Sequence, residues 1–201
     1  MIILTHQNLM PLYTEDKTFD KIDLKEYPLQ KGEYDNCKFS NCDFSNTNLS
    51  EIKFVDCEFI ACNLSLVKLT KTSFSEIKFK DCKILGLHFE NCNPFGLAFS
   101  FENCSLNHSS FYKTKIKKTS FKNTQLQDTD FTECDLTAAV LDNCDLMNAK
   151  FENTILEKAD LRRAYNYSID PEINRIKKAR FSLAGVVGLL NKYDIEIEGL
   201  N

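Results

Sequence analysis

The sequence has little of what catalysis commonly uses. Its 201 residues include only six glycines and three histidines, which are His6, His88 and His108. No glycine-rich phosphate loop is present, and no histidine stands in a Ser/His/Asp, Cys/His or metal-ligand pattern. We therefore expect a protein that is not an enzyme, with no catalytic residues, no cofactor and no metal.

Long apolar runs are also missing. The longest late run, LAGVVGLL (183–190), is too short to cross a bilayer. The first ten residues, MIILTHQNLM, lack the basic start of a signal peptide. The formal net charge is only −4. These features favour a cytoplasmic protein that does not interact with membranes.

What the sequence does contain is a five-residue rhythm. In CKFSNCDFSNTNLS (37–50), a phenylalanine or leucine stands at every fifth position. A period of five fits neither a helix nor a strand, so it indicates internal repetition. Apolar residues keep this phase from Phe19 to Phe89, and the rhythm resumes two residues out of phase from Phe101 to Leu161.

Compact side chains form a second column, two residues before each apolar position. All nine cysteines lie in this column. Stacked residues such as Cys37 and Cys57 are candidates for disulfide bonds. We expect free thiols instead, because the column requires a small apolar side chain and the number of cysteines is odd. Asn or Asp is frequent two residues after each apolar position, where it marks a corner.

A five-residue side with a turn at each corner closes after four sides, which gives a twenty-residue coil in a stacked solenoid. The stretch TDFTECDLTAAVLDNCDLMNAKF (129–151) closely resembles the pentapeptide repeat family, whose motif is A(D/N)LXX. The resemblance covers about residues 19–161. It implies an all-β fold, a right-handed quadrilateral β-helix of about seven 20-residue coils with a short C-terminal helix and strand cap.

We expect three segments along the chain. An N-terminal cap occupies residues 1–18 and includes a short strand at Ile2, Ile3 and Leu4. The repeat β-helix occupies residues 19–164, and a C-terminal cap and dimerisation segment occupies residues 165–201.

The rhythm is interrupted once, at NPFGLAFSF (93–101). Pro94 takes an apolar position, Gly96 follows, and the phase slips by two residues. This pattern predicts a bulge or a kink between two stacks, and a recognition loop is the alternative.

The C-terminal segment predicts a helix followed by a short strand. Its apolar residues cover more than one side of the helix, which leaves apolar area after the last coil is capped. Such a patch favours a homodimer with two-fold symmetry. The predicted dimer interface consists of Leu183, Val186, Val187, Leu189, Leu190, Ile195 and Ile197.

Charge is unevenly spread. Residues 124–161 carry nine carboxylates and two lysines, a local net charge of −7. A lysine cluster precedes this segment at residues 113–122, and basic residues follow from Arg162 to Arg180. The nine carboxylates are the candidate partner-binding surface: Asp128, Asp130, Glu133, Asp135, Asp142, Asp145, Glu152, Glu157 and Asp160.

Within the family that the chain resembles, proteins of the Qnr and MfpA type are rods that imitate duplex DNA and bind type II topoisomerases, protecting gyrase from quinolones. The resemblance implies a non-enzymatic rod that binds DNA gyrase or topoisomerase IV and does not bind nucleic acid directly. Any mimicry of DNA is partial, because about 35 Å of duplex carries about twenty negative charges, whereas this chain carries a net charge of −4. The alternative is an interaction scaffold or regulator with an unknown protein partner. A continuous acidic face would favour the first function, and scattered charge the second.

Overall fold

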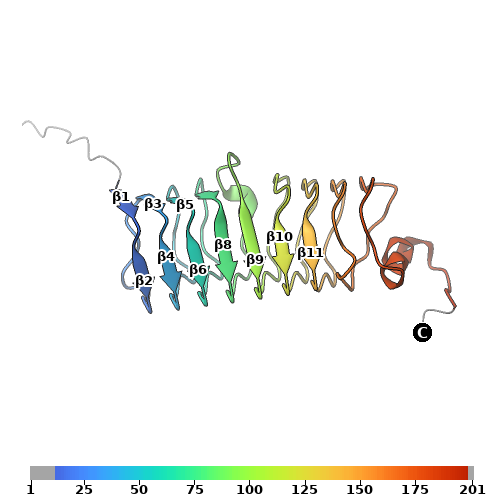
Figure 1. Ribbon diagram of the computed structural model, residues 1–201, viewed down its shortest axis with the longest axis horizontal. Helices are drawn as coiled ribbons and strands as arrows, with labels where there is room; N and C mark the ends of the chain where they lie inside the picture. The colour runs from blue at the N-terminus through green and yellow to red at the C-terminus, as the bar shows by residue number, and fades with distance from the viewer. Residues whose placement is uncertain (1–11, 199–201) are drawn as a thin grey trace, which may run out of the picture.

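The protein is a straight rod of stacked coils, seen from the side in Figure 1. The computed structural model describes residues 12–198. Every strand pair in this range is parallel, and residues that pair are usually twenty positions apart, as in Phe39 with Phe59. The all-β solenoid expected from the repeat is confirmed.

Two sheets run along the rod within residues 12–198. The smaller sheet has the order β1-β3-β5-β7, and the larger has the order β11-β10-β9-β8-β6-β4-β2. The smaller sheet contains β1 (Leu12–Glu15), β3 (Gly32–Asp35), β5 (Lys53–Val55) and β7 (Ser73–Ser75). The larger sheet contains β2 (Thr18–Asp20), β4 (Lys38–Ser40), β6 (Glu58–Ile60), β8 (Ile77–Lys80), β9 (Phe99–Glu102), β10 (Ser120–Lys122) and β11 (Val140–Asp142).

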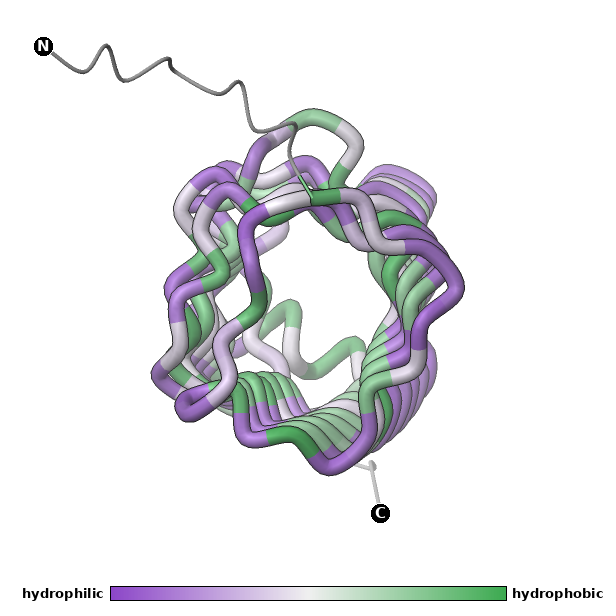
Figure 2. Tube along the Cα trace, turned by 90° about the vertical axis from the view of Figure 1, so that its left-hand side faces the viewer, coloured by the Kyte–Doolittle hydropathy of each residue, from purple (hydrophilic) through white to green (hydrophobic). Residues whose placement is uncertain are grey.

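The rod has four faces, as the view along its axis in Figure 2 shows. The β1 face carries the smaller sheet and continues after residue 98 through single bridges, and the β2 face carries the larger sheet. On the other two faces, successive coils pair through single bridges. We name them the Asp145 face, which runs from Asp23 to Tyr165, and the Asp130 face, which runs from Asn48 to Lys150. The bridged residues that continue the β1 face are Lys115, Asp135, Ile155 and Arg175.

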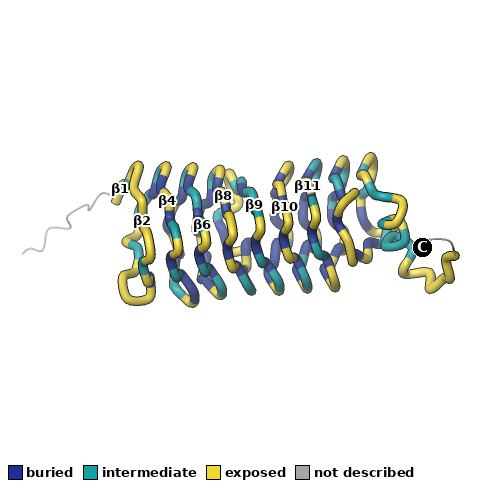
Figure 3. The backbone as a smooth tube through the Cα atoms, turned by 60° about the horizontal axis from the view of Figure 1, so that its bottom comes forward, coloured by how far each residue is buried: buried dark blue, intermediate teal, exposed yellow. Residues whose placement is uncertain are grey.

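The apolar column fills the interior because every fifth side chain points inward. Buried residues accordingly recur in each coil of the tube in Figure 3. Rings in successive coils stack, with centroids 4.9 Å apart for Phe39 and Phe59. Rings on neighbouring faces meet edge to face, as Phe54 and Phe59 do at 5.5 Å. These are the offset and edge contacts that aromatic rings prefer, so the column is a continuous packed core.

The corner residues adopt the left-handed conformation. Asn41, for example, has φ 54° and donates its backbone N–H to the Ile60 oxygen of the next coil at 2.9 Å. Asn and Asp tolerate this conformation better than other non-glycine residues, which explains their frequency at these positions.

All nine cysteines are buried and free. Seven of the thiols donate to backbone oxygens of the preceding coil, as Cys57 does to Tyr34 at 3.3 Å. Burial raises the pKa of Cys57 to about 12, and it raises the pKa of Cys134 and of Cys144 to the same value. The expectation of free thiols as core filler is confirmed.

The interrupted stretch is a loop on the β1 face. After the short helix η1 (Phe89–Asn91), residues 93–98 project from the rod, in green in Figure 1. Strand β8 still pairs with β9, but its partner residues are 22 positions apart, as in Phe79 with Phe101. The loop therefore accommodates two extra residues on one face, and the coils continue to stack after it.

The C-terminal end is covered by two short 3-10 helices, η2 (Ala184–Leu189) and η3 (Asn191–Tyr193). Gly188 lies directly on Tyr167, because a Cβ there would overlap the Tyr167 carbonyl oxygen. This glycine therefore serves close packing of the cap against the last coil.

The predicted C-terminal strand at Ile195 and Ile197 is wrong, since residues 194–198 form no strand. Asp194 takes φ 48°, and both isoleucines are exposed, so the segment has no neighbouring strand edge to pair with. The predicted strand at Ile2, Ile3 and Leu4 lies outside the described residues. Among residues 12–198, no helix is long and apolar enough to cross a membrane.

Candidate partner-binding surfaces

Any function of this rod must lie on its outside. Phenylalanine and leucine side chains fill the interior, and the hollows along residues 12–198 open on the surface. The same residues contain no group of three His, Cys, Asp or Glu side chains placed to hold a metal ion. The sides and the ends are therefore the candidate functional surfaces.

The nine predicted acidic residues do not gather on one face. They are distributed around the whole circumference, because successive sides of one coil turn by roughly a right angle. Asp142 and Asp160 lie on the β2 face, Asp128 and Asp145 on the Asp145 face, Asp130, Glu133 and Glu152 on the Asp130 face, and Asp135 and Glu157 on the β1 face.

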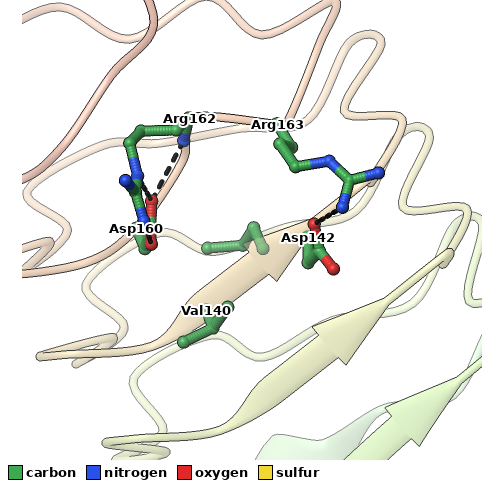
Figure 4. A pocket seen from close by; sticks show the side chains of 6 residues that line it. Val140, Asp142, Asp160, Arg162 and Arg163 are labelled. Carbon is green, nitrogen blue, oxygen red and sulfur yellow. Dashed lines mark hydrogen bonds and ion pairs between the residues drawn. The ribbon is translucent and has the colours of Figure 1, made fainter.

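Arginines neutralise several of these carboxylates. A surface hollow of about 410 Å³ lies beside β11. Arg163 lines it and binds Asp142 at 3.0 Å, an ion pair marked in Figure 4. In the same hollow Asp160 accepts from Arg162 at 2.9 Å and from Arg180 at 2.6 Å. The hydrogen bond from Arg162 lowers the pKa of Asp160, so this carboxylate stays ionised and paired.

Other carboxylates are paired with residues of neighbouring coils. The pairs are Glu157 with Arg175 at 2.7 Å, Asp135 with Lys117 at 3.2 Å, Glu133 with Lys113 at 3.5 Å, and Asp128 with His108 at 3.6 Å. Within residues 12–198, no ion pair forms at Asp130, Asp145 or Glu152. The predicted surface therefore reduces to a few unpaired carboxylates on two faces.

The Asp145 face carries the clearest net negative charge, but its charge is low for a DNA mimic. From Asp23 to Asn148 it has five carboxylates and two lysines, a net of −3. The β2 face, from Thr18 to Leu183, has eight cations and six carboxylates, a net of +2. A duplex of comparable length carries about twenty negative charges. No face approaches this density along its length.

The predicted dimer residues divide into two groups. Leu189 packs against the core cluster, and Val187 and Leu190 are partly buried, so these three contribute to the cap. The others remain exposed, and Leu183 is 83% exposed. The exposed group consists of Leu183, Val186, Ile195 and Ile197.

Sequence reasoning did not select Phe95, although its side chain is 84% exposed at the tip of the 93–98 loop. Pro94, Phe95 and Leu97 line a hollow of about 650 Å³ together with Tyr112 and Lys115. The break in the five-residue rhythm was the available signal, because Phe95 is a phenylalanine that lies outside the apolar column.

Comparison with known proteins agrees with this architecture. The sequence profile described as pentapeptide repeat region matches residues 33–99 and 98–164. No curated protein matches the sequence.

Several solved structures have a similar fold. A trypsin-treated form of QnrB1, a plasmid-mediated fluoroquinolone resistance protein, is 16% identical with a TM-score of 0.60, covering 94% of this chain and 100% of that chain. HetL, a pentapeptide repeat protein involved in heterocyst differentiation regulation from the cyanobacterium Nostoc sp. strain PCC 7120, is 12% identical with a TM-score of 0.64. That match covers 84% of this chain and 85% of HetL. At these identities the likeness concerns the fold alone.

Proposed function

The chain belongs to the pentapeptide repeat family, and we propose that it works without catalysis, as a rod that binds another protein. The observation that carries this proposal is the division between a filled core and a variable polar exterior. The repeated side chains are used for packing, so only the outward positions and the ends are left for recognition.

A type II topoisomerase, DNA gyrase or topoisomerase IV, is the first candidate partner, with protection from quinolones as the consequence. The fold likeness to QnrB1 over 94% of the chain supports it. So does the local excess of carboxylates in residues 124–161. In this function the rod is a partial DNA mimic, and the unpaired Asp130, Asp145 and Glu152 are the groups that contact cationic side chains of the enzyme.

An interaction scaffold or regulator with another protein partner is the second candidate. The scatter of the nine carboxylates over four faces, and the pairing of five of them with lysine or arginine side chains, favours this function over extended mimicry. The likeness to HetL, a regulatory protein by its description, supports it too.

A supercoiling assay separates the two candidates. Purified protein is added to DNA gyrase in up to tenfold excess, with and without a fluoroquinolone. Inhibited supercoiling or reduced drug-induced cleavage supports topoisomerase binding. If neither occurs, that candidate is wrong and the scaffold function remains.

Two matched double variants then locate the surface. Asp130→Asn with Glu152→Gln removes two unpaired carboxylates from residues 124–161. Asp20→Asn with Glu26→Gln removes the same charge near the other end. We expect only the first pair to weaken the effect on gyrase, and equal loss in both would contradict the assignment of the binding surface.

We also propose that two rods join end to end through the exposed C-terminal residues. Leu183 is the best probe, because at 83% exposure it can be changed without disturbing the cap. Leu183→Asp is expected to abolish this contact in light scattering, and Leu66→Asp, at a corner that is 61% exposed, serves as the control. If the Leu183→Asp protein associates as strongly as the unchanged protein, the contact lies elsewhere.

A further inference from the structure

The 93–98 loop divides the β1 face into equal halves (Figure 1). Four rungs precede it, the strands β1, β3, β5 and β7, and four bridged rungs follow it, at Lys115, Asp135, Ile155 and Arg175. We call residues 12–76 of this face the acidic half and residues 115–178 the basic half. Their charges are opposite.

The acidic half has six carboxylates and two lysines, a net of −4, and the basic half has seven cations and two carboxylates, a net of +5. The carboxylates of the acidic half are Glu15, Asp16, Glu33, Asp35, Asp56 and Glu76, and its lysines are Lys17 and Lys53. The cations of the basic half are Arg175 and the six lysines Lys115, Lys117, Lys118, Lys158, Lys177 and Lys178.

Contacts within the chain leave most of this charge unpaired. Three ion pairs lie on the face, at Lys53 with Glu33, Lys117 with Asp135 and Arg175 with Glu157. Among residues 12–198, five carboxylates of the acidic half and five lysines of the basic half have no ion pair. The two halves are thus complementary to each other but cannot meet within one rod.

An apolar feature marks the midpoint between the halves. Phe95 is 84% exposed at the tip of the loop, and Gly96 beside it, with φ 74°, has open space where a side chain would be. The adjoining hollow of about 650 Å³ is lined in part by Leu97 and Tyr112. An aromatic anchor beside a hollow, flanked by charged residues, is the usual layout of a protein interface.

We propose that the β1 face binds a second copy of this chain, antiparallel, about a two-fold axis that lies across the rods at the loop. Each Phe95 then enters the hollow beside the loop of the other copy. The acidic half of each rod faces the basic half of the other, so the face is self-complementary, as a two-fold interface requires.

The rung spacing brings particular residues together. Counting rungs outward from the loop, Glu76 of one copy faces Lys118 of the other, and Asp16 faces Lys178. Lys53 likewise faces Asp135. Asp35 faces Glu157, a like-charge pair that Arg175 and Lys158 offset. In a parallel arrangement, each rung would instead face the same rung of the other copy, so like charges would meet, which is unfavourable.

The available area suits a stable contact. Eight rungs at about 4.8 Å and a five-residue side of about 16 Å give about 600 Å² per copy. About 1,200 Å² in total is the lower end of the standard range for specific interfaces. The surface is separate from the C-terminal contact proposed above, and either can exist without the other.

Charge reversal tests the proposal directly. All proteins carry Leu183→Asp, so that association through the ends does not interfere. The first variant combines Lys118→Glu, Lys158→Glu and Lys178→Glu, which changes the net charge of the basic half from +5 to −1, so that both halves are negative. The second combines Asp16→Lys, Asp56→Lys and Glu76→Lys, which changes the net charge of the acidic half from −4 to +2, so that both halves are positive. Corners occupied by Glu51 and Lys71 show that either residue type fits this backbone.

We expect each variant alone to be monomeric in light scattering at a concentration where the parent is a dimer. An equal mixture of the two should recover the dimer mass, because the negative face of one meets the positive face of the other. Lys38→Glu with Lys80→Glu on the β2 face is the control and should leave the parent mass unchanged. A monomeric parent, or a mixture that stays monomeric, overturns the proposal.

A cross-link locates the axis. Phe95→Cys places an exposed thiol at the two-fold axis, whereas Ser120→Cys places one on the β2 face. Mild oxidation should join Phe95→Cys proteins at least tenfold faster than Ser120→Cys proteins, since the native thiols are buried. Equal rates would contradict the assigned axis, even if the protein were dimeric.

Discussion

The stack before the 93–98 loop and the stack after it differ in backbone pairing. Before the loop, strands form on both the β1 and β2 faces, whereas after it β9, β10 and β11 form on the β2 face alone. The buried column of the β1 face changes at the same point. It contains Tyr34, Phe54 and Phe74 before the loop, and Ile116, Leu136 and Leu156 after it. On this face, the coils with a buried aromatic residue form strands, in agreement with the high β propensity of aromatic residues.

Aromatic rings alone do not produce a strand. Phe111, Phe131 and Phe151 stack at 5.3 Å on the Asp130 face, where residues 48–150 form single bridges. The core also passes the loop unbroken, since Phe79 stacks on Phe101 at 5.2 Å. Packing along the columns therefore continues whether or not the backbone forms strands, so stability should depend on the columns.

Thiol protection should show the largest effect. Six cysteines precede the loop and three follow it, and all nine are buried. Because labelling requires opening of the core, we expect each thiol to react at least about a thousandfold more slowly in the native protein than in denaturant. Mass spectrometry after timed labelling measures this. Rapid reaction of the three later cysteines alone would show that the second stack is the looser one.

Truncation of the β2 column compares the two stacks. Phe59→Ala should lower the free energy of unfolding by about 4 kcal/mol, and Leu141→Ala by about 3 kcal/mol, because both leave a cavity and the ring is larger. Urea unfolding measures both losses. A loss below about 1 kcal/mol at Leu141 would show that the second stack does not depend on its column.

The C-terminal cap should respond to a single methyl group. Gly188→Ala forces the cap away from the Tyr167 backbone and should cost about 1–3 kcal/mol. Gly96→Ala in the loop meets no neighbouring atom and only strains a backbone at φ 74°, so it should cost about 1 kcal/mol. Thermal unfolding of the two proteins checks the order, and a larger loss at Gly96 would contradict the close packing of the cap.

The smallest effect concerns pH near the N-terminal end. Burial opposes ionisation of Asp43, but hydrogen bonds from Lys25 and Ser45 and the charge of Lys25 lower its pKa to about 2. This carboxylate therefore stabilises the fold above its unfolded pKa of about 4, and the contribution is lost as pH falls toward 2. Solvent screens the pair, so the contribution should stay below about 1 kcal/mol. Asp43→Asn should flatten this part of the pH profile, and an unchanged profile would assign the pH dependence to other groups.

The coil length, the buried columns, the corner positions and the free thiols could all be predicted from the sequence. These properties depend on contacts between a residue and its equivalents one coil away, such as Phe39 and Phe59, so a fixed period in the sequence is enough to specify them. The same locality explains why the strand predicted at Ile195 and Ile197 is wrong. Their alternation fits a strand, but a strand also needs an edge to pair with, and the end of the stack offers none.

Which charges share a face could not be predicted without the tertiary structure. Nine carboxylates that are neighbours in residues 124–161 point in four directions, and each meets a cation from another coil or none. Conversely, Asp16 and Lys178 lie far apart in the sequence but occupy the same edge of one face, on opposite sides of a loop that adds two residues. Burial follows the local five-residue period, whereas surface charge depends on the closure of four sides and on the register across that loop. The core could therefore be read from the sequence, and the binding surfaces required the folded rod.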